Sequence, residues 1–188
     1  MRIAFFGDSY TEGTPFQTTD PEIWPNLIGK HLNAQVDNQY ASGGSNRAIF
    51  RNICRYFQHN TCDLAIVMWS HYMRNEIHIK EEVYQIQPKS NSFPKQFVEK
   101  YYRNQNENAH WQDFIDHIWA VEKIISVPHF QGCCFPLEKA LNKPKHWFSL
   151  SMWEMMGPST PCGHPEKFGH KNIYEYMVKH LQRCNLML

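Results

Sequence analysis

Short apolar runs alternate with amphipathic stretches along the first third of the chain. Apolar runs occupy residues 2–7 and 63–69, and a weaker run occupies residues 35–41. Between these runs, apolar side chains recur at helical spacing over residues 21–32 and again after Ser45. A continuous apolar run is typical of a strand that is buried on both faces of a parallel sheet. The alternation therefore predicts an α/β fold, a three-layer sandwich with a central parallel sheet flanked by helices.

The pattern loosens from about residue 70 to residue 108. Pro88, Pro94 and the polar run at residues 103–108 predict a long excursion with short helical pieces. A connection of this length inside a compact domain usually has a function. We interpret residues 70–108 as a lid or wall over the site of chemistry, with a tolerated surface insertion as the open alternative.

Regular patterning returns in the rest of the chain. Residues 111–125 carry a broad apolar face and predict a helix. Residues 127–135 predict a fourth strand, residues 136–141 a short helix and residues 166–181 the last helix. Residues 146–156 are rich in Trp, Phe and Met, which indicates core and pocket wall rather than a cofactor site.

Composition narrows the class of protein. The chain has 188 residues, which predicts a single domain over residues 1–188. The formal net charge of +1 argues against a broad nucleic-acid surface, and no apolar run approaches the roughly 18 residues of a membrane span. The chain opens on a strand rather than a signal peptide, so we expect a cytoplasmic location. Six cysteines without a CxxC pair favour reduced thiols over a disulfide framework.

The first apolar run ends in Gly7-Asp8-Ser9, which predicts a sharp turn. Asp8 and Ser9 have short polar side chains that suit a turn or a helix N-cap. Open α/β folds bind ligands at the carboxyl ends of their strands, and helix N-terminal amides stabilise negative charge on a substrate oxygen. Ser9 therefore lies where a ligand is expected, although this motif taken alone is more often a capping turn.

A second motif lies near the other end of the chain, where residues 161–170 read Pro-Cys-Gly-His-Pro-Glu-Lys-Phe-Gly-His. The first histidine, His164, suits a general base because imidazole titrates near neutral pH. These two motifs, with the glycine block at residues 41–46, resemble those of the SGNH (GDSL-type) hydrolases over nearly the whole chain. The resemblance implies an SGNH hydrolase/flavodoxin-like fold, with Ser9 as the nucleophile and His164 as the base.

The resemblance also implies an oxyanion hole for the attacked carbonyl group. The backbone N–H of Ser9 is one donor, and Gly43 is the expected second donor, with Gly44 as the alternative register. The family's third donor is an Asn side chain in a Gly-x-Asn-Asp motif that this chain does not match. Ser70 falls at that position, so its hydroxyl is the candidate. Asn46 is an alternative source of an amide toward the substrate, although capping the following helix is its better-supported role.

The acid of the expected catalytic triad is also missing. The family usually has Asp two or three residues before the histidine, where this chain has Pro161 and Cys162. Cys162, a backbone carbonyl, a water molecule or Glu154 could orient the ring of His164 instead. The sequence therefore predicts a Ser–His dyad or an atypical triad, with slow turnover.

Two charged residues follow Ser70 closely, Arg74 and Glu76. Arg74 is a candidate contact for a polar or anionic part of the substrate, and a salt bridge that stiffens the base of the excursion is the alternative. The spacing of cysteines and histidines matches no usual zinc pattern, so we expect no metal and no cofactor.

Together these observations favour a serine hydrolase that cleaves a carboxylic ester. The expected substrate is a small-molecule ester, for example an acylated carbohydrate or other metabolite. The alternative is an SGNH-fold protein that has weak or no hydrolytic activity and binds a ligand or a protein partner. An acyltransferase is a third hypothesis. The sequence leaves the oligomeric state open.

Overall fold

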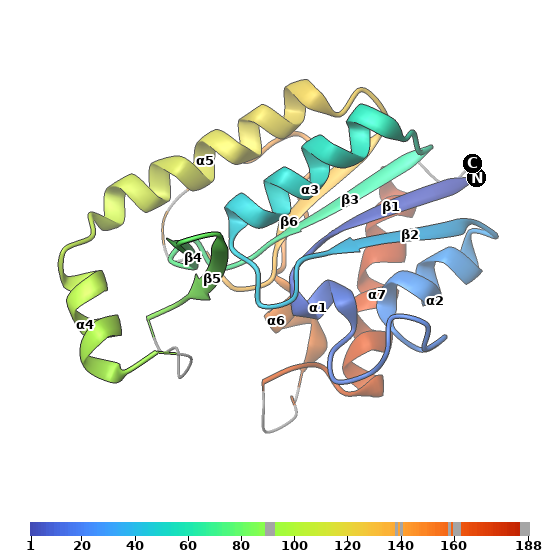
Figure 1. Ribbon diagram of the computed structural model, residues 1–188. Helices are drawn as coiled ribbons and strands as arrows, with labels where there is room; N and C mark the ends of the chain where they lie inside the picture. Colours follow the sequence, from blue (N-terminus) through green and yellow to red (C-terminus); the bar gives the residue numbers. More distant parts are fainter. Residues whose placement is uncertain (89–92, 138, 140, 158, 160–162, 185–188) are drawn as a thin grey trace.

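Four parallel strands form the centre of the molecule (Figure 1). The computed structural model describes residues 1–88, 93–137, 139, 141–157, 159 and 163–184. The strands lie in the order β2 (Gln35–Tyr40), β1 (Arg2–Gly7), β3 (Leu64–Trp69) and β6 (His129–Cys133). Each of these neighbouring pairs is parallel, as the sequence predicts for strands connected by helices.

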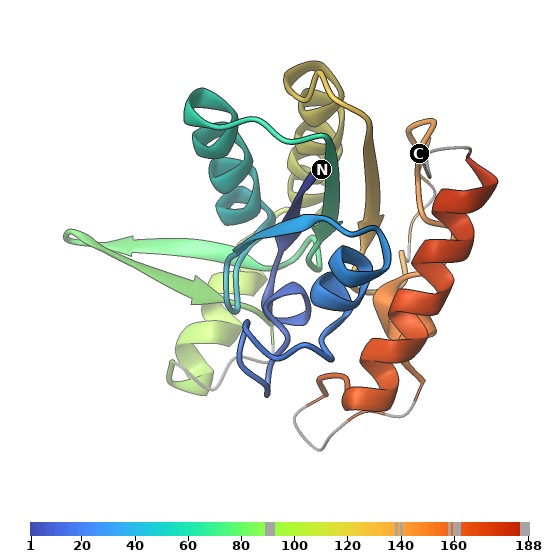
Figure 2. The same ribbon diagram turned by 90° about the vertical axis from the view of Figure 1, so that its right-hand side faces the viewer.

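Helices cover both faces of this sheet (Figures 1 and 2). One face packs against α3 (Asn46–His59) and α5 (Glu107–Ile124), and the other packs against α2 (Trp24–His31) and α7 (Lys167–Arg183). The short helix α6 (Met152–Met156) lies against α7. The predicted three-layer α/β sandwich is therefore confirmed.

Strand β1 shows why its apolar run is continuous. Ile3 and Phe5 pack in the core on the side of α2 and α7, whereas Ala4 and Phe6 pack on the side of α3 and α5. Side chains alternate between the two faces of a strand, so a strand covered on both faces needs apolar residues at every position. The chain turns from β1 to β2 on one side and later crosses to β3 on the other. The carboxyl end of β1 is thus a topological switch point, where α/β folds bind ligands.

Residues 70–108 form an arm that includes a hairpin, which the sequence pattern did not predict. Strands β4 (Asn75–Ile79) and β5 (Glu82–Ile86) pair in antiparallel fashion, and α4 (Lys95–Arg103) follows them. Figure 2 shows the hairpin extending away from the sandwich. Because most of the hairpin residues are only partly buried or exposed, no strict apolar alternation marks the two strands.

The base of the arm is held by polar contacts. The hydroxyl of Tyr102 lies within hydrogen-bond distance of the carbonyl oxygens of Met73 and Ile86, at 2.8 and 3.0 Å, and so fastens α4 to the hairpin. The role of the arm as a lid stays a prediction.

Arg51 joins the arm to α3. The spacing of Arg47, Arg51 and Arg55 indicates a solvated helix face, and Arg51, whose side chain is 39% exposed, also binds a carboxylate of the arm. Arg51 makes a two-pronged ion pair with the Glu76 carboxylate, at 2.6 and 2.7 Å, and the side chain of Glu76 is fully buried. Burial by itself raises the pKa of Glu76, but hydrogen bonds from Arg51 and Gln85 hold that pKa below its usual range.

Two further elements differ from the prediction. Helix α5 begins at Glu107 rather than residue 111, because the side chain of Asn106 caps it by accepting from the amide of Asn108 at 3.0 Å. The helix expected at residues 136–141 is absent from the described residues of that segment.

Within the ranges that the structure describes, none of the helices is both long and apolar enough to cross a membrane.

His170 makes the stability of this fold sensitive to acid. Its ring is fully buried, and burial lowers its pKa from 6.5 to about 4. The unfolded chain therefore binds the proton before the folded chain does, so stability is complete above pH 6.5 and falls as the pH drops toward 4. The shift corresponds to a loss of about 3 kcal/mol in the free energy of unfolding.

We expect His170→Gln to flatten this pH dependence, because glutamine keeps an acceptor for the amide of Trp24 and does not titrate. Urea unfolding at several pH values between 4 and 8 measures the slope. His59→Gln, at the exposed end of α3, is the control and should keep the wild-type slope. An unchanged slope in His170→Gln would assign the acid sensitivity to other groups.

Candidate active site

The turn between β1 and α1 (Ser9–Glu12) explains the Gly-Asp-Ser motif residue by residue. A Cβ atom on Gly7 would lie 2.0 Å from the side-chain oxygen of Thr11, so only glycine fits there. Asp8 is the N-cap, and its carboxylate accepts from the amide of Tyr10 at 3.0 Å. Ser9 begins the helix and is 6% exposed.

Ser9 meets His164 across 155 positions of the chain. The Oγ atom of Ser9 lies 2.8 Å from Nε2 of His164. Tyr10 supports the histidine loop, because its phenol donates to the carbonyl oxygen of Gly163 at 2.7 Å and its ring lies 5.2 Å from the imidazole ring. The arrangement can transfer a proton from the hydroxyl to the imidazole. The structure thus brings the expected nucleophile and base together, and their catalytic roles stay predictions.

The sequence offered several groups that could orient the ring of His164 in place of the usual Asp, and the structure describes only some of them. Pro161 and Cys162 lie outside the described residues. Glu154 is committed to the N-terminus of α6, where its carboxylate accepts from both the amide and the hydroxyl of Ser151 at 2.7 Å.

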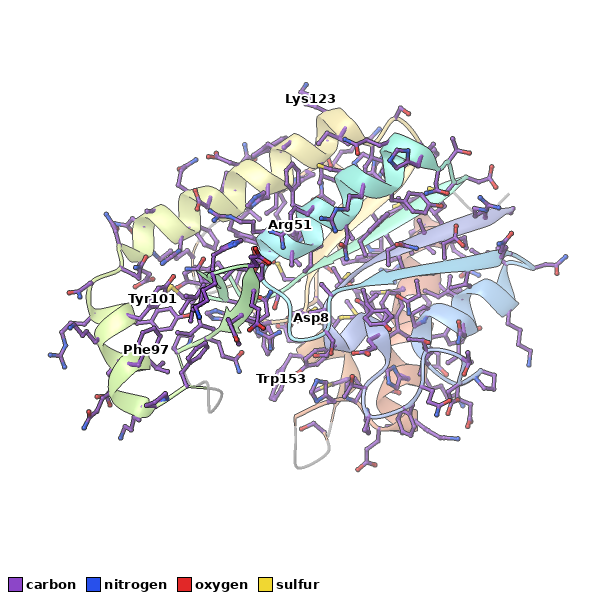
Figure 3. All side chains as sticks on the ribbon, viewed as in Figure 1. Asp8, Arg51, Phe97, Tyr101, Lys123 and Trp153 are labelled. Atoms are coloured by element: carbon purple, nitrogen blue, oxygen red, sulfur yellow. The ribbon has the colours of Figure 1, made fainter. Side chains whose placement is uncertain are left out.

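The carboxylate of Asp8, labelled in Figure 3, is buried and makes more contacts than the turn pattern indicated. Besides capping α1, it accepts from the Ser70 hydroxyl at 2.8 Å, from Arg74 Nη1 at 3.0 Å and from the Cys134 thiol at 3.2 Å. Burial, together with the charge of Asp8, raises the pKa of Cys134 well above its usual range, so this thiol stays protonated. The sequence signal for this cluster was weak, because Asp8 also fits an ordinary cap.

The candidates for the oxyanion hole occupy three loops at the same sheet edge. Gly43 has a φ of +63° and open space where a Cβ would project, whereas the amide of Gly44 donates to Ala41 within a turn at 2.7 Å. These features agree better with Gly43 than with Gly44 as a donor. The hydroxyl of Ser70 donates to Asp8. Its role as the third donor, like that of Gly43, stays a prediction.

Asn46 and Arg74, the two candidate substrate contacts, are both engaged with protein groups. The Asn46 amide accepts from the Ser70 amide at 2.8 Å and donates to the Ser70 carbonyl at 3.2 Å, which ties α3 to the end of β3. Arg74 binds Asp8 and Gln87 instead of Glu76, so the expected salt bridge exists with a different carboxylate. Substrate contact by either residue stays a prediction.

Aromatic side chains border the dyad. Phe135 lies with its ring centre 5.5 Å from Tyr10 and 6.1 Å from Trp153, and the guanidinium of Arg74 sits 5.5 Å above it. Trp153 is 42% exposed and lies beside Gly163, which precedes His164. This agrees with the interpretation of residues 146–156 as core and pocket wall.

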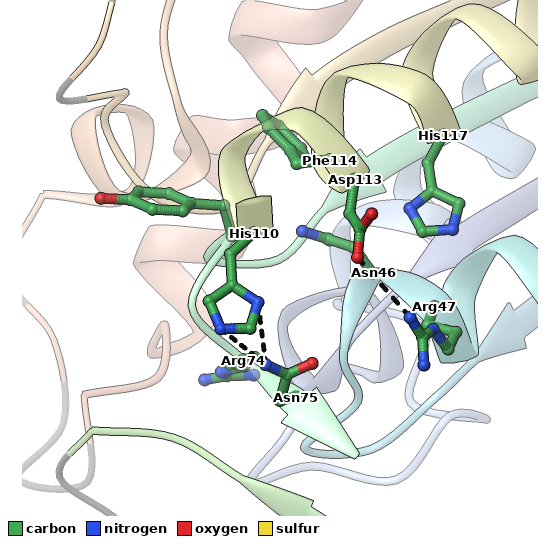
Figure 4. Close-up of a pocket in the computed structure, with 9 residues that line it drawn as sticks. Asn46, Arg47, Arg74, Asn75, His110, Asp113, Phe114 and His117 are labelled. Carbon is green, nitrogen blue, oxygen red and sulfur yellow. Dashed lines mark hydrogen bonds and ion pairs between the residues drawn. The ribbon is translucent and has the colours of Figure 1, made fainter. Parts of the chain in front are cut away.

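A small polar pocket lies between α3, the base of the arm and α5 (Figure 4). Asn75 contacts His110 in it, at 3.0 Å, and Arg47 pairs with Asp113 at 3.6 Å. Burial lowers the pKa of His110, which favours its neutral form at pH 7. Among the described residues, no group of three or more His, Cys, Asp or Glu side chains is arranged to hold a metal ion.

Comparisons with known proteins identify the fold. Neither a family model nor a curated relative matches the sequence. Among solved structures, the esterase EstA from Pseudoalteromonas sp. is 10% identical over 98% of each chain, with a TM-score of 0.60. A G-D-S-L family lipolytic protein from Veillonella parvula is 12% identical over 97% of this chain and 99% of its own, with a TM-score of 0.59.

A family two carbohydrate esterase from Clostridium thermocellum, solved with cellohexaose, is also similar. It is 12% identical over all of this chain and 65% of its own, with a TM-score of 0.59. The expectation drawn from the two terminal motifs is confirmed at the level of architecture: this chain has the fold of the SGNH (GDSL-type) hydrolases.

Proposed function

We propose that this chain is a serine hydrolase that cleaves the carboxylic ester of a small molecule. The observation that carries the proposal is the 2.8 Å separation of Ser9 Oγ and His164 Nε2 at the carboxyl end of the central strand. A serine hydroxyl is a weak nucleophile until a base removes its proton, and this separation suits direct proton transfer. The fold shared with esterases supports the same chemistry.

The reaction follows from these positions. His164 Nε2 takes the proton of Ser9 while Oγ bonds to the carbonyl carbon of the ester. The carbonyl oxygen becomes an oxyanion, which accepts hydrogen bonds from the amides of Ser9 and Gly43. The ester C–O bond then breaks, and His164 returns the proton to the departing alcohol. Water attacks the acyl-enzyme with His164 again as the base, which releases the carboxylic acid and restores Ser9.

The engagement of Ser70 with Asp8 predicts slow turnover. Its hydroxyl proton points to the buried carboxylate, so two amides hold the oxyanion in this arrangement. Loss of one oxyanion donor typically costs about 10²- to 10³-fold in kcat. The same observation favours our second candidate function, a protein of this fold that binds a ligand without hydrolysing it.

An acylated carbohydrate is the substrate class that we favour. The exposed ring of Trp153 lies beside the loop that carries His164 and presents a flat apolar surface. Aromatic rings bind the apolar faces of sugar rings well, because they are broad, rigid and apolar. The similarity to a carbohydrate esterase points the same way.

Removal of the nucleophile provides the direct test. We expect Ser9→Ala to abolish hydrolysis of a small activated ester, and to abolish labelling by a fluorophosphonate probe, with circular dichroism unchanged. Ser126→Ala, which alters an exposed serine between α5 and β6 at the opposite edge of the sheet, is the matched control and should retain both activities. Labelling of wild type would support the hydrolase, and an unlabelled wild type that also fails to hydrolyse activated esters would favour the binding protein.

The contact between Tyr10 and Gly163 provides a finer test. Tyr10→Phe removes one hydrogen bond that holds the histidine loop, worth about 1 kcal/mol. We therefore expect kcat/KM to fall about fivefold, because the imidazole is held less firmly near Ser9. Tyr174→Phe is the control and should leave kcat/KM unchanged. It removes a hydroxyl on α7 that contacts His31 on α2. Equal loss in both variants would indicate a general effect on stability.

A further inference from the structure

The ion pair of Asp8 and Arg74 lies directly beside the proposed nucleophile. The Asp8 side chain is fully buried, and the Arg74 side chain is 13% exposed. Their atoms approach to 3.0 Å. Asp8 precedes Ser9, whose amide is a predicted oxyanion donor, and its carboxylate accepts the hydroxyl proton of Ser70, the candidate third donor.

A bare carboxylate at this place would oppose the proposed reaction. The oxyanion carries negative charge that develops in the transition state, and the negative charge of Asp8, on the residue next to the nucleophile, repels it. Such repulsion is strong in a site that excludes water, because the effective dielectric constant there is low. Asp8 is nevertheless useful to the fold, because it caps α1 and orders the nucleophile turn.

Arg74 is held in the position that cancels this charge. Its Nε atom donates to the side chain of Gln87 at 2.9 Å, and its guanidinium lies over the ring of Phe135. A guanidinium group remains charged at all ordinary pH values. The two hydrogen bonds and the ring contact keep its positive charge next to Asp8.

We propose that Arg74 is a positioning residue that neutralises Asp8, so that one turn can hold both a capping carboxylate and an oxyanion site. The proposal rests on the proposed hydrolase function. In this role Arg74 lowers the energy of the transition state by cancelling the charge of Asp8. The role differs from the earlier expectation that Arg74 contacts a polar or anionic part of the substrate.

The test compares four variants in hydrolysis of neutral and anionic activated esters. We expect Arg74→Met to lower kcat about ten- to a hundredfold with KM nearly unchanged, because the uncompensated charge acts on the transition state. Arg74→Lys should retain most of the activity, since it keeps the charge. The double variant Asp8→Asn/Arg74→Met should recover most of the lost kcat, because asparagine still caps α1 but carries no charge.

Arg51→Met is the matched control. It also removes an arginine from a buried carboxylate, Glu76, but at the junction of the arm and α3. We expect it to lower the urea midpoint of unfolding and to leave kcat close to wild type. A merely structural role of Arg74 would make Arg74→Met and Arg51→Met behave alike.

Three outcomes would overturn the proposal. The first is wild-type kcat in Arg74→Met, and the second is a double variant no faster than Arg74→Met. The third is a rise in KM for anionic esters alone, which would make Arg74 a substrate contact.

Urea unfolding separates this proposal from the hydrolase itself. If wild type neither hydrolyses esters nor reacts with a fluorophosphonate, the proposed function fails, yet charge compensation still predicts that Asp8→Asn restores the stability lost in Arg74→Met. A double variant no more stable than Arg74→Met would contradict the compensation whatever the enzyme does.

Discussion

The carboxylate of Asp8 is the constraint on which the arrangement of the site depends. A fully buried charge is costly unless hydrogen bonds and an opposite charge surround it. Its donors come from four separate parts of the chain: an amide of α1, the hydroxyl of Ser70 after β3, Arg74 at the base of the arm and the thiol of Cys134 after β6. These contacts bring the four parts together around Asp8, the residue before Ser9.

Two arginine–carboxylate pairs attach the arm to the sandwich in opposite directions. Arg51 reaches from α3 to Glu76 in the arm, and Arg74 reaches from the arm to Asp8 in the sandwich. A buried ion pair adds little net stability, but separating its partners leaves an uncompensated charge and is strongly unfavourable. The base of the arm is therefore fastened to the sandwich by one pair from each side.

The two histidines of the C-terminal motif, His164 and His170, lie in different surroundings. Nε2 of His164 lies 2.8 Å from the hydroxyl of Ser9. His170, on α7, is fully buried and accepts from the amide of Trp24, and burial lowers its pKa to about 4. The motif alone does not distinguish these environments, because the difference comes from the segments that pack around each ring.

By itself, the sequence determined the layers and the edge at which chemistry is expected. Strands covered on both faces must be apolar throughout, as β1 and β3 are, and the motifs of Ser9 and His164 flank elements that end at one edge of the sheet. The hairpin of the arm, the partner of Arg51 and the donors around Asp8 were decided by tertiary structure. These polar residues form no periodic pattern, and the side-chain partners of Asp8 and Arg51 lie 25 to 126 positions away in the chain. Such contacts form only after the apolar layers have brought distant segments together.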